Sequence, residues 1–209
     1  LTSLYNALKI AGLSWMEIQL GYHEADENDI IIDLALKINI PETELLRPLN
    51  PYGESKIKTE KFLFQNKNRF KFIILRYFNV AGADPSLRTG LISKNTTHLI
   101  KITSEVAVGK REKVTIFGND YNTPDGTGIR DYIHVKDLAT AHIKTLNTII
   151  EKKENLILNL ATGEGYSVLE VIRKTQEITG KEVNYNIVER RPGDLAKLVA
   201  TSKLAHNMI

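Results

Sequence analysis

Short apolar runs alternate with amphipathic stretches along most of the chain, a pattern typical of an α/β protein. The longest apolar run, FKFIILRYFNV at residues 70–80, predicts a strand that is buried on both faces of a parallel sheet. Further strands are predicted at 113–117, 130–135, 155–161 and 183–188. Helices are predicted at 2–11, 51–68, 98–108, 138–150 and 168–180, whereas no clear period is found over 13–40.

Particular residue types mark where these helices begin and end. Pro51 is a favourable first helical residue, and Asp137 is a favourable N-cap for the helix that follows it. Ser167 and Glu170 have the spacing of a capping box, and Gly180 is placed to end the same helix. The sequence therefore carries local boundary signals as well as an apolar pattern.

The composition excludes several classes of function. The 209 residues are 42% hydrophobic and 25% charged, which is ordinary for a folded soluble protein. The net charge of +3 is small and the basic residues are scattered among 25 acidic ones, so we expect no nucleic-acid partner. No apolar run is long enough to span a membrane and no secretory signal is visible. The lack of cysteine excludes disulfides and thiolate chemistry and agrees with a cytoplasmic location.

Tyr52 and Lys56 are candidates for acid–base chemistry. Side chains four residues apart lie on one face of a helix, so the ammonium group of Lys56 can act on the phenol of Tyr52. A nearby positive charge favours the phenolate and lowers the pKa of the phenol from about 10. The pair can therefore move a proton, although the spacing alone also fits an ordinary surface helix.

Polar residues at the ends of strands are further candidates. Asn79 follows the apolar core of the longest run, and ligands of open α/β sheets bind beyond the carboxyl ends of strands; a turn-forming role is the alternative. Arg190 and Arg191 follow the last predicted strand and could clamp a diphosphate, with surface salt bridges as the alternative. His134 is explained more simply as a hydrogen-bonded structural residue than as a catalytic one.

Two loops that look like ligand sites are better explained by local structure. Gly163 and Gly165 lie between a predicted strand and a helix, but Val168 stands where a dinucleotide loop needs its third glycine. Residues 118–128 are rich in Asp and Asn, but their spacing does not match a calcium-binding EF-hand loop. We therefore predict no metal site.

Five motifs, taken together, resemble those of the UDP-glucose 4-epimerase family, which belongs to the extended short-chain dehydrogenases. They are NPYGESK (50–56), LRYFNVAGA (75–83), FGNDY (117–121), DGTGIRDYIHVKDLA (125–139) and RRPGD (190–194). The resemblance extends from about residue 40 to about residue 204 and returns at 2–12. Related nucleotide-sugar dehydratases share the Tyr-x-x-x-Lys motif but usually lack the longer NDY…DGT loop, so a dehydratase is the second alternative.

The resemblance implies an α/β fold with a partial Rossmann-like parallel sheet, its N-terminal strands missing, and a smaller C-terminal α/β substrate domain. Residues 1–80 would be the remainder of the NAD-binding domain, with 13–36 atypical. Residues 81–209 would mainly form the UDP-sugar domain, with 113–139 and 155–161 partly returning to the Rossmann core. The resemblance is also compatible with a homodimer.

The activity implied by the resemblance is the interconversion of UDP-glucose and UDP-galactose through a 4-keto intermediate, with NAD as the cofactor. Tyr52 would take the proton of the sugar 4-hydroxyl, and Lys56 would lower the pKa of Tyr52 and hold the ribose hydroxyls of NAD. Phe78 would contact the nicotinamide. The UDP-sugar would be bound by Asn79, His98, Leu99, Arg130, Arg191 and Asp194.

Parts of the family pattern are not found in the sequence. The opening strand, the Gly-rich NAD loop and the acidic ribose anchor are missing, which corresponds to roughly 90 residues. No Ser or Thr occurs between Ser14 and Thr43, where the family has the hydroxyl partner of its catalytic tyrosine, and the family's final helix is also missing. The sequence therefore predicts a chain truncated at both ends and inactive in isolation. It is either an epimerase completed by other parts or a non-catalytic remnant that binds UDP-sugars weakly.

Overall fold

The computed structural model describes residues 40–44, 46, 51–191 and 193–209. The helix predicted at 2–11, the segment 13–36 and the expected N-cap Asn50 lie outside the described residues. The element order is α3 (Pro51–Gln65), β1 (Ile73–Tyr77), β2 (Asn79–Ala81), α4 (Leu99–Ala107), β3 (Val114–Phe117), β4 (Ile129–His134), α5 (Val135–Lys152), β5 (Leu156–Leu160), β6 (Gly165–Ser167), α6 (Val168–Thr179), β7 (Tyr185–Val188), β8 (Lys197–Leu198) and α7 (Lys203–Met208). The predicted α/β class is confirmed.

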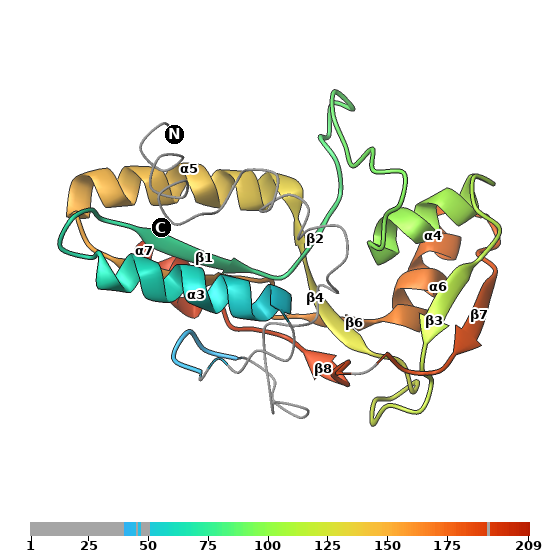
Figure 1. Cartoon of the computed structure of the whole chain (residues 1–209). Coiled ribbons are helices and arrows are strands. Elements are labelled where there is room, and N and C mark those ends of the chain that lie inside the picture. The colour runs from blue at the N-terminus through green and yellow to red at the C-terminus, as the bar shows by residue number, and fades with distance from the viewer. Residues whose placement is uncertain (1–39, 45, 47–50, 192) are drawn as a thin grey trace.

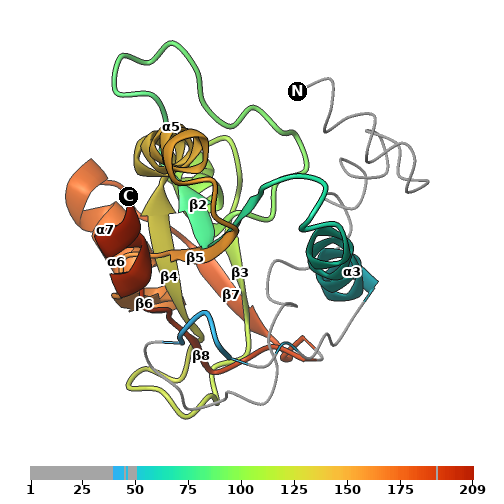
Figure 2. The same cartoon turned by 90° about the vertical axis from the view of Figure 1, so that its left-hand side faces the viewer.

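Strands β1 and β5 form a parallel pair at one end of the molecule (Figure 1), with Ile73 opposite Leu156 and Tyr77 opposite Leu160. Helices α5 and α3 lie on opposite sides of this pair (Figure 2). A core cluster that includes Leu158 and Leu138 joins the pair to α5, and Ala205 adds α7 to the same cluster. This end has the helix-on-sheet layering of a Rossmann-like fold.

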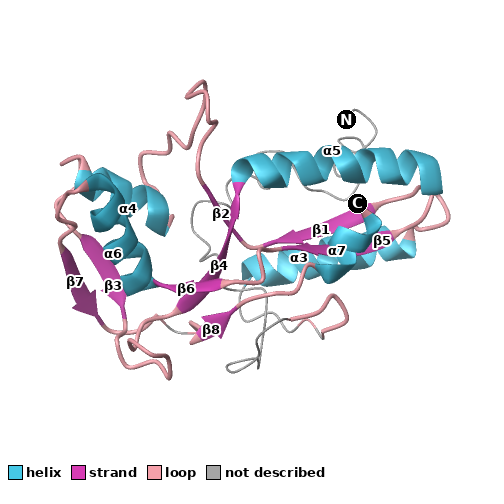
Figure 3. Ribbon diagram, turned by 180° about the vertical axis from the view of Figure 1, so that it is seen from behind, coloured by secondary structure: helices cyan, strands magenta, loops and turns pink. Residues whose placement is uncertain are grey.

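The opposite end contains the parallel pair β3 and β7 with α4 and α6 packed beside it (Figure 3). Its core cluster includes Val106 of α4, Val114 and Ile116 of β3, and Ile172 of α6. Between the two ends, β4 pairs in parallel with β2 and β8 and antiparallel with β6. This middle sheet connects the two helix-covered ends.

The prediction of one continuous strand over 70–80 is wrong. β1 pairs with β5 whereas β2 pairs with β4, and Phe78 lies between them. The N–H of Phe78 still donates to the carbonyl of Leu160 at 3.4 Å, after which the chain leaves the first sheet and enters the middle one. β1 is also half-buried rather than buried on both faces, because among the described strands it has a neighbour on one side only.

The N-cap of α5 is His134, not the predicted Asp137. The Nδ1 atom of His134 accepts a hydrogen bond from the N–H of Lys136 at 3.1 Å, so the helix begins at Val135. A structural role for His134 is therefore supported. The capping box of Ser167 and Glu170 is confirmed, as are Pro51 as the first residue of α3 and the left-handed Gly180 at the end of α6.

None of the helices in the described part of the chain combines the length and apolarity needed to cross a membrane.

Candidate functional site

Two adjoining cavities lie where the middle sheet meets its neighbours. The larger has a volume of about 670 Å³ and the smaller about 290 Å³. Asn79, Val80 and His98 line both. The larger cavity is within the range of small-molecule sites in proteins. Because the cavities share a wall, ligands bound in each would lie next to one another.

Tyr52 and Lys56 line the smaller cavity from the first turns of α3. The Nζ atom of Lys56 lies 4.9 Å from the centroid of the Tyr52 ring, so the structure brings the predicted pair together. Burial lowers the pKa of Lys56 from its ordinary value, because a low-dielectric environment disfavours the charged form. Phe78 lines the same cavity.

A clamp between α3 and β1 fixes the helix that carries this pair. Arg76 of β1 donates from Nε and Nη2 to the two carboxylate oxygens of Glu60 at 2.9 and 2.7 Å. Its Nη1 also donates to the carbonyl of Glu42 at 3.0 Å. Two-point arginine–carboxylate bonds define orientation as well as distance, so α3 is held at a set position on the sheet.

Replacing Lys56 with Met should stabilise the chain. Because the pKa of Lys56 is lowered in the folded chain, the charged ammonium group lowers the free energy of unfolding. This destabilisation is fully present at pH values below the folded-state pKa. The unfolded chain binds more protons between that pKa and the ordinary value of 10.5, so wild-type stability should rise with pH in this window. At pH 7 we expect Lys56→Met to raise the melting temperature by about 2–4 °C, measured by circular dichroism.

Lys58→Met is the matched control, because Lys58 lies on the same helix with a side chain that is 77% exposed. Its melting temperature should stay within about 2 °C of wild type. Equal shifts for the two variants would show that burial of the Lys56 ammonium group carries no cost.

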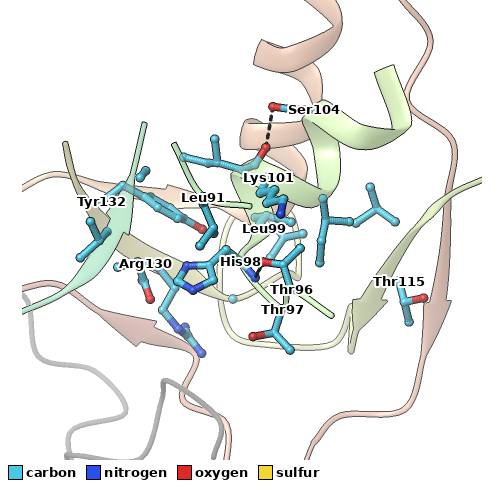
Figure 4. A pocket seen from close by; sticks show the side chains of 18 of the residues that line it. Leu91, Thr96, Thr97, His98, Leu99, Lys101, Ser104, Thr115, Arg130 and Tyr132 are labelled. Atoms are coloured by element: carbon cyan, nitrogen blue, oxygen red, sulfur yellow. Dashed lines mark hydrogen bonds between the residues drawn. The ribbon is translucent and has the colours of Figure 1, made fainter. Parts of the chain in front are cut away.

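The larger cavity is lined by residues from β2, α4, β3 and β4. In Figure 4, His98 and Arg130 lie near one another, with Tyr132 beside them and Thr115 on the far side. His98 is the N-cap residue of α4 and its N–H donates to Oγ1 of Thr96 at 3.2 Å. The side-chain amide of Asn79 donates to the carbonyl of Asp131 at 3.2 Å, which joins β2 to β4 at the wall between the cavities.

Arg130 and Asp194 form a nearly buried ion pair in the larger cavity. Nη2 of Arg130 donates to Oδ1 of Asp194 at 2.8 Å, and Nη1 donates to the carbonyl of Leu195 at 2.8 Å. Each side chain of the pair is 10% exposed. The guanidinium carbon of Arg191 lies 3.8 Å from the centroid of the Phe117 ring. Two motifs 64 residues apart are thus joined at one site.

The larger cavity has an excess of positive charge. Among its described lining residues, Asp194 is the carboxylate, whereas the cations are Lys101, Arg111, Arg130 and Arg191. Glu105, outside the lining, pairs with Lys101 at 3.6 Å and with Arg111 at 3.2 Å, so a net positive charge remains. The side chain of His98 makes no capping hydrogen bond to the first turn of α4. The N–H groups and dipole of a helix N-terminus favour negative charge. The cavity is therefore suited to an anionic ligand.

All nine residues predicted for the site line one cavity or the other. Tyr52, Lys56 and Phe78 line the smaller one, Asn79 and His98 line both, and the larger one adds Leu99, Arg130, Arg191 and Asp194. Their individual roles remain predictions. The sequence analysis missed Tyr132, which could have been found because residues i and i+2 of a strand share a face. It also missed Thr96 and Lys101, for which the sequence carries no comparable signal.

A model of the NAD dependent epimerase/dehydratase family matches residues 35–161. The chain belongs to this family. The match covers α3, β1, β2 and β4, the elements that carry the Tyr52/Lys56 pair, Asn79 and Arg130. Membership thus rests on a part of the chain that supplies most of the lining of both cavities, whereas Arg191 and Asp194 lie beyond it.

Individual members of this family are similar over most of the chain. The UDP-glucose 4-epimerase of Azospirillum brasilense is 48% identical over 155 residues, covering 73% of the chain and 44% of that protein. The structure of the Brucella ovis UDP-glucose 4-epimerase in complex with NAD has a TM-score of 0.80 and 36% identity, covering 87% and 56%. That of the Bifidobacterium longum enzyme in complex with NAD⁺ and UDP has a TM-score of 0.76 and 39% identity, covering 83% and 53%.

The chain thus spans about half the length of the relatives it matches. The similarity supports the Rossmann-like α/β assignment. Both solved relatives are named UDP-glucose 4-epimerase, which is the family that the sequence motifs resemble.

Proposed function

We propose that the chain forms the UDP-sugar site and the proton-transfer pair of an NAD-dependent UDP-glucose 4-epimerase. The observation that carries this proposal is the adjoining pair of cavities, one with Tyr52 and Lys56 and the other rich in positive charge. An enzyme that acts on a nucleotide sugar needs one site for the anionic diphosphate and an adjoining site that reacts with the sugar. Relatives named UDP-glucose 4-epimerase favour epimerisation over the dehydratase alternative.

The larger cavity would bind the UDP portion. Arg130 and Arg191 would provide guanidinium groups for the diphosphate. The N-terminus of α4, which begins at Leu99 after its N-cap His98, would add helix N–H groups. Asp194 would provide a carboxylate that accepts a hydrogen bond from a hydroxyl group of the ligand. Asn79 would provide its amide group at the wall shared by the two cavities. The sugar would then extend past Asn79 toward Tyr52.

The residues of the smaller cavity fit the nicotinamide end of NAD. Apolar side chains such as Leu75 and Phe78 line it together with Lys56, which suits a flat ring joined to a ribose. Phe78 would contact the ring, and the ammonium group of Lys56 would donate to ribose hydroxyls. When bound, NAD supplies a hydride acceptor and donor for carbon 4 of the sugar.

Proton transfer would be the task of Tyr52. Its phenolate oxygen would accept the proton of the sugar 4-hydroxyl and return it when the opposite epimer forms. Lys56, with its ammonium group 4.9 Å from the phenol ring centroid, would stabilise the phenolate. The Arg76–Glu60 clamp would keep α3, and therefore the pair, in place during both steps.

The proposal also assigns the parts of the fold to two ligands. The end built from α3, β1, α5 and β5 would contribute to the NAD-binding domain, to which residues 1–80 were assigned. The end built from α4, β3, α6 and β7 would form the UDP-sugar domain, within residues 81–209. Of the two segments expected to return to the Rossmann core, 155–161 would contain β5, and 113–139 would contribute only its end, where α5 begins.

Binding of UDP tests the anion site without requiring turnover. We expect UDP to bind the chain in isothermal titration calorimetry, and Arg191→Met to weaken its Kd by about tenfold or more, since charge-assisted bonds to phosphate are strong. Met keeps much of the length of the side chain, so packing against Phe117 is partly retained.

Arg173→Met is the control, because Arg173 is an exposed residue of α6 outside the lining of both cavities. It should leave the Kd of UDP unchanged. Lack of UDP binding by the wild-type chain, or equal loss in both variants, would contradict the proposed site.

A further inference from the structure

Gly128 is a cavity residue whose lack of a side chain is not explained by its own backbone. It lies at the end of the loop between β3 and β4 and lines the larger cavity. Gly118 and Gly126 of the same loop have left-handed φ angles of +86° and +79°, whereas Gly128 is not among the glycines with a positive φ. Its φ angle therefore does not require glycine. The surroundings of Gly128, rather than its conformation, decide which side chain can be accommodated there.

A Cβ atom at Gly128 would meet the guanidinium group of Arg130. It would lie 3.1 Å from Nη1 and 3.6 Å from both Cζ and Nη2. Non-bonded atoms are most stable at separations of about 3.5–4.0 Å, so the contact with Nη1 is too close by a few tenths of an ångström. The guanidinium group thus occupies space that any side chain at Gly128 would need.

Hydrogen bonds hold the Nη1 atom of Arg130 where it is. Nη1 donates to the carbonyl of Leu195 at 2.8 Å and to the carbonyl of Ile129 at 3.0 Å. The neighbouring Nη2 donates to Asp194 at 2.8 Å. The side chain of Arg130 is 10% exposed, so water offers little replacement for a bond that is lost. An added methyl group at Gly128 would therefore compete directly with these bonds.

The backbone on each side of Gly128 is fixed as well. The preceding Thr127 is fully buried, and its N–H and its Oγ1 both donate to Oδ1 of Asp125, at 2.9 and 2.7 Å. The N–H of the following Ile129 donates to the carbonyl of Ala196 at 2.9 Å. Because the backbone is bonded before and after the glycine, the guanidinium group is the part that an added methyl group would displace.

We propose that Gly128 is a positioning residue, which by its lack of a side chain leaves the guanidinium group of Arg130 at the place from which it binds the diphosphate. The proposal rests on the UDP-sugar site proposed above. Gly128 acts through Arg130 and does not need to touch the ligand. Charge-assisted bonds to phosphate depend on geometry as well as charge, so a displaced guanidinium group binds the diphosphate less tightly.

Gly128→Ala should raise the Kd of UDP by about fivefold, because part of a charge-assisted interaction is lost. Stability should change little, since alanine restricts the unfolded chain more than glycine does and this offsets the crowded contact. We expect the melting temperature to stay within about 3 °C of wild type. Isothermal titration calorimetry and circular dichroism measure the two effects.

Gly180→Ala is the control and should show the opposite pattern. Gly180 ends α6 with a φ of +63°, and a Cβ atom there would meet nothing within 4 Å. It lies outside the lining of both cavities. Strain should lower its melting temperature by about 3–6 °C, while the Kd of UDP stays within about twofold of wild type. An equal rise in Kd for both variants would attribute the weaker binding to general destabilisation and overturn the inference.

A double-mutant cycle with Arg130→Lys tests whether the effect passes through the guanidinium group. Lysine keeps a positive charge beside Asp194 but lacks the Nη1 atom that the added methyl group would meet. In this background, Gly128→Ala should change the Kd of UDP by less than about twofold. An undiminished fivefold effect would overturn the inference.

Crystal structures of the wild type and of Gly128→Ala test the displacement without measuring affinity. The distance from Nη1 of Arg130 to the carbonyl of Leu195 should be longer in the variant. A guanidinium group that has not moved would overturn the inference. If Gly128→Ala binds UDP as tightly as the wild type, the inference fails while the UDP site stands. A wild-type chain that does not bind UDP would overturn both the site and the role of Gly128.

Discussion

In the chain complemented by an N-terminal NAD-binding fragment of a relative, replacing Tyr52 with Phe should lower the rate of UDP-galactose formation from UDP-glucose and added NAD⁺ by about 10²- to 10⁴-fold. The phenol oxygen is the proton acceptor in the proposed reaction, and Phe keeps the ring beside Lys56 while removing that oxygen. Because the UDP portion would bind in the larger cavity, the affinity for UDP should change little. Product formation can be measured by chromatography of the nucleotide sugars.

Tyr185→Phe serves as the control for this experiment, because Tyr185 lies on β7 outside the lining of both cavities. It should keep the wild-type rate. A Tyr52→Phe variant with unchanged turnover would exclude Tyr52 as the base. A wild-type chain that shows no turnover even with the complementing N-terminal fragment would contradict the epimerase activity. Lys56→Met should be slower than wild type although it is more stable, a known conflict between function and stability.

Gly126→Ala should destabilise the chain by about 3–5 kcal/mol. Gly126 has a φ of +79°, and a Cβ atom there would lie 2.0 Å from the carbonyl oxygen of Asn119. The contact is with backbone, so the loop between β3 and β4 must open to relieve it. Its closing bond from Tyr121 to Gly126 would be lost. We expect a fall in melting temperature of about 10 °C or more.

Gly109→Ala isolates the contribution of the clash. Gly109 has a similar φ of +75°, but a Cβ atom there would meet nothing within 4 Å. It should therefore cost only the strain of the left-handed conformation, about 1–2 kcal/mol. Urea unfolding of both variants measures the difference, and similar values for the two would show that the loop at Gly126 accommodates the added methyl group.

Local signals predicted the elements better than their partners. The apolar run at 70–80 identified strand-forming sequence, but its division at Phe78 depends on pairing with β5 and β4, which lie more than 50 residues away in the chain. Periodicity contains no information about such partners. The choice of His134 over Asp137 as the N-cap of α5 likewise depends on where β4 ends, which is set by its pairing in the middle sheet.

Asp131 illustrates a structural role that the sequence did not reveal. It is fully buried and accepts hydrogen bonds from the N–H and Oγ1 of Thr162, both at 2.8 Å, and from the N–H of Gly163 at 2.9 Å. These bonds explain why the Gly163 loop has a structural role, as predicted. The donors are 31 and 32 residues away, so local patterns could not identify them.

The contacts between site residues could be predicted from local sequence in the smaller cavity but not in the larger one. The Tyr52/Lys56 contact follows from helix geometry, since the spacing of four residues fixes it. The meeting of Arg130 with Asp194 does not follow from any local period, because three strands and two helices separate them in the chain. That part of the prediction came from the family resemblance, and the structure places these residues in one cavity.

The division of the apolar run at Phe78 has a consequence for ligand affinity. Asn79 lines both cavities and follows Phe78 directly, so a ligand that shifts Asn79 in one cavity alters the wall of the other. Linkage then requires reciprocity: if a nucleotide sugar raises the affinity for a dinucleotide by some factor, the dinucleotide raises the affinity for the nucleotide sugar by the same factor. A single residue between two sheets can thus make the two binding equilibria interdependent.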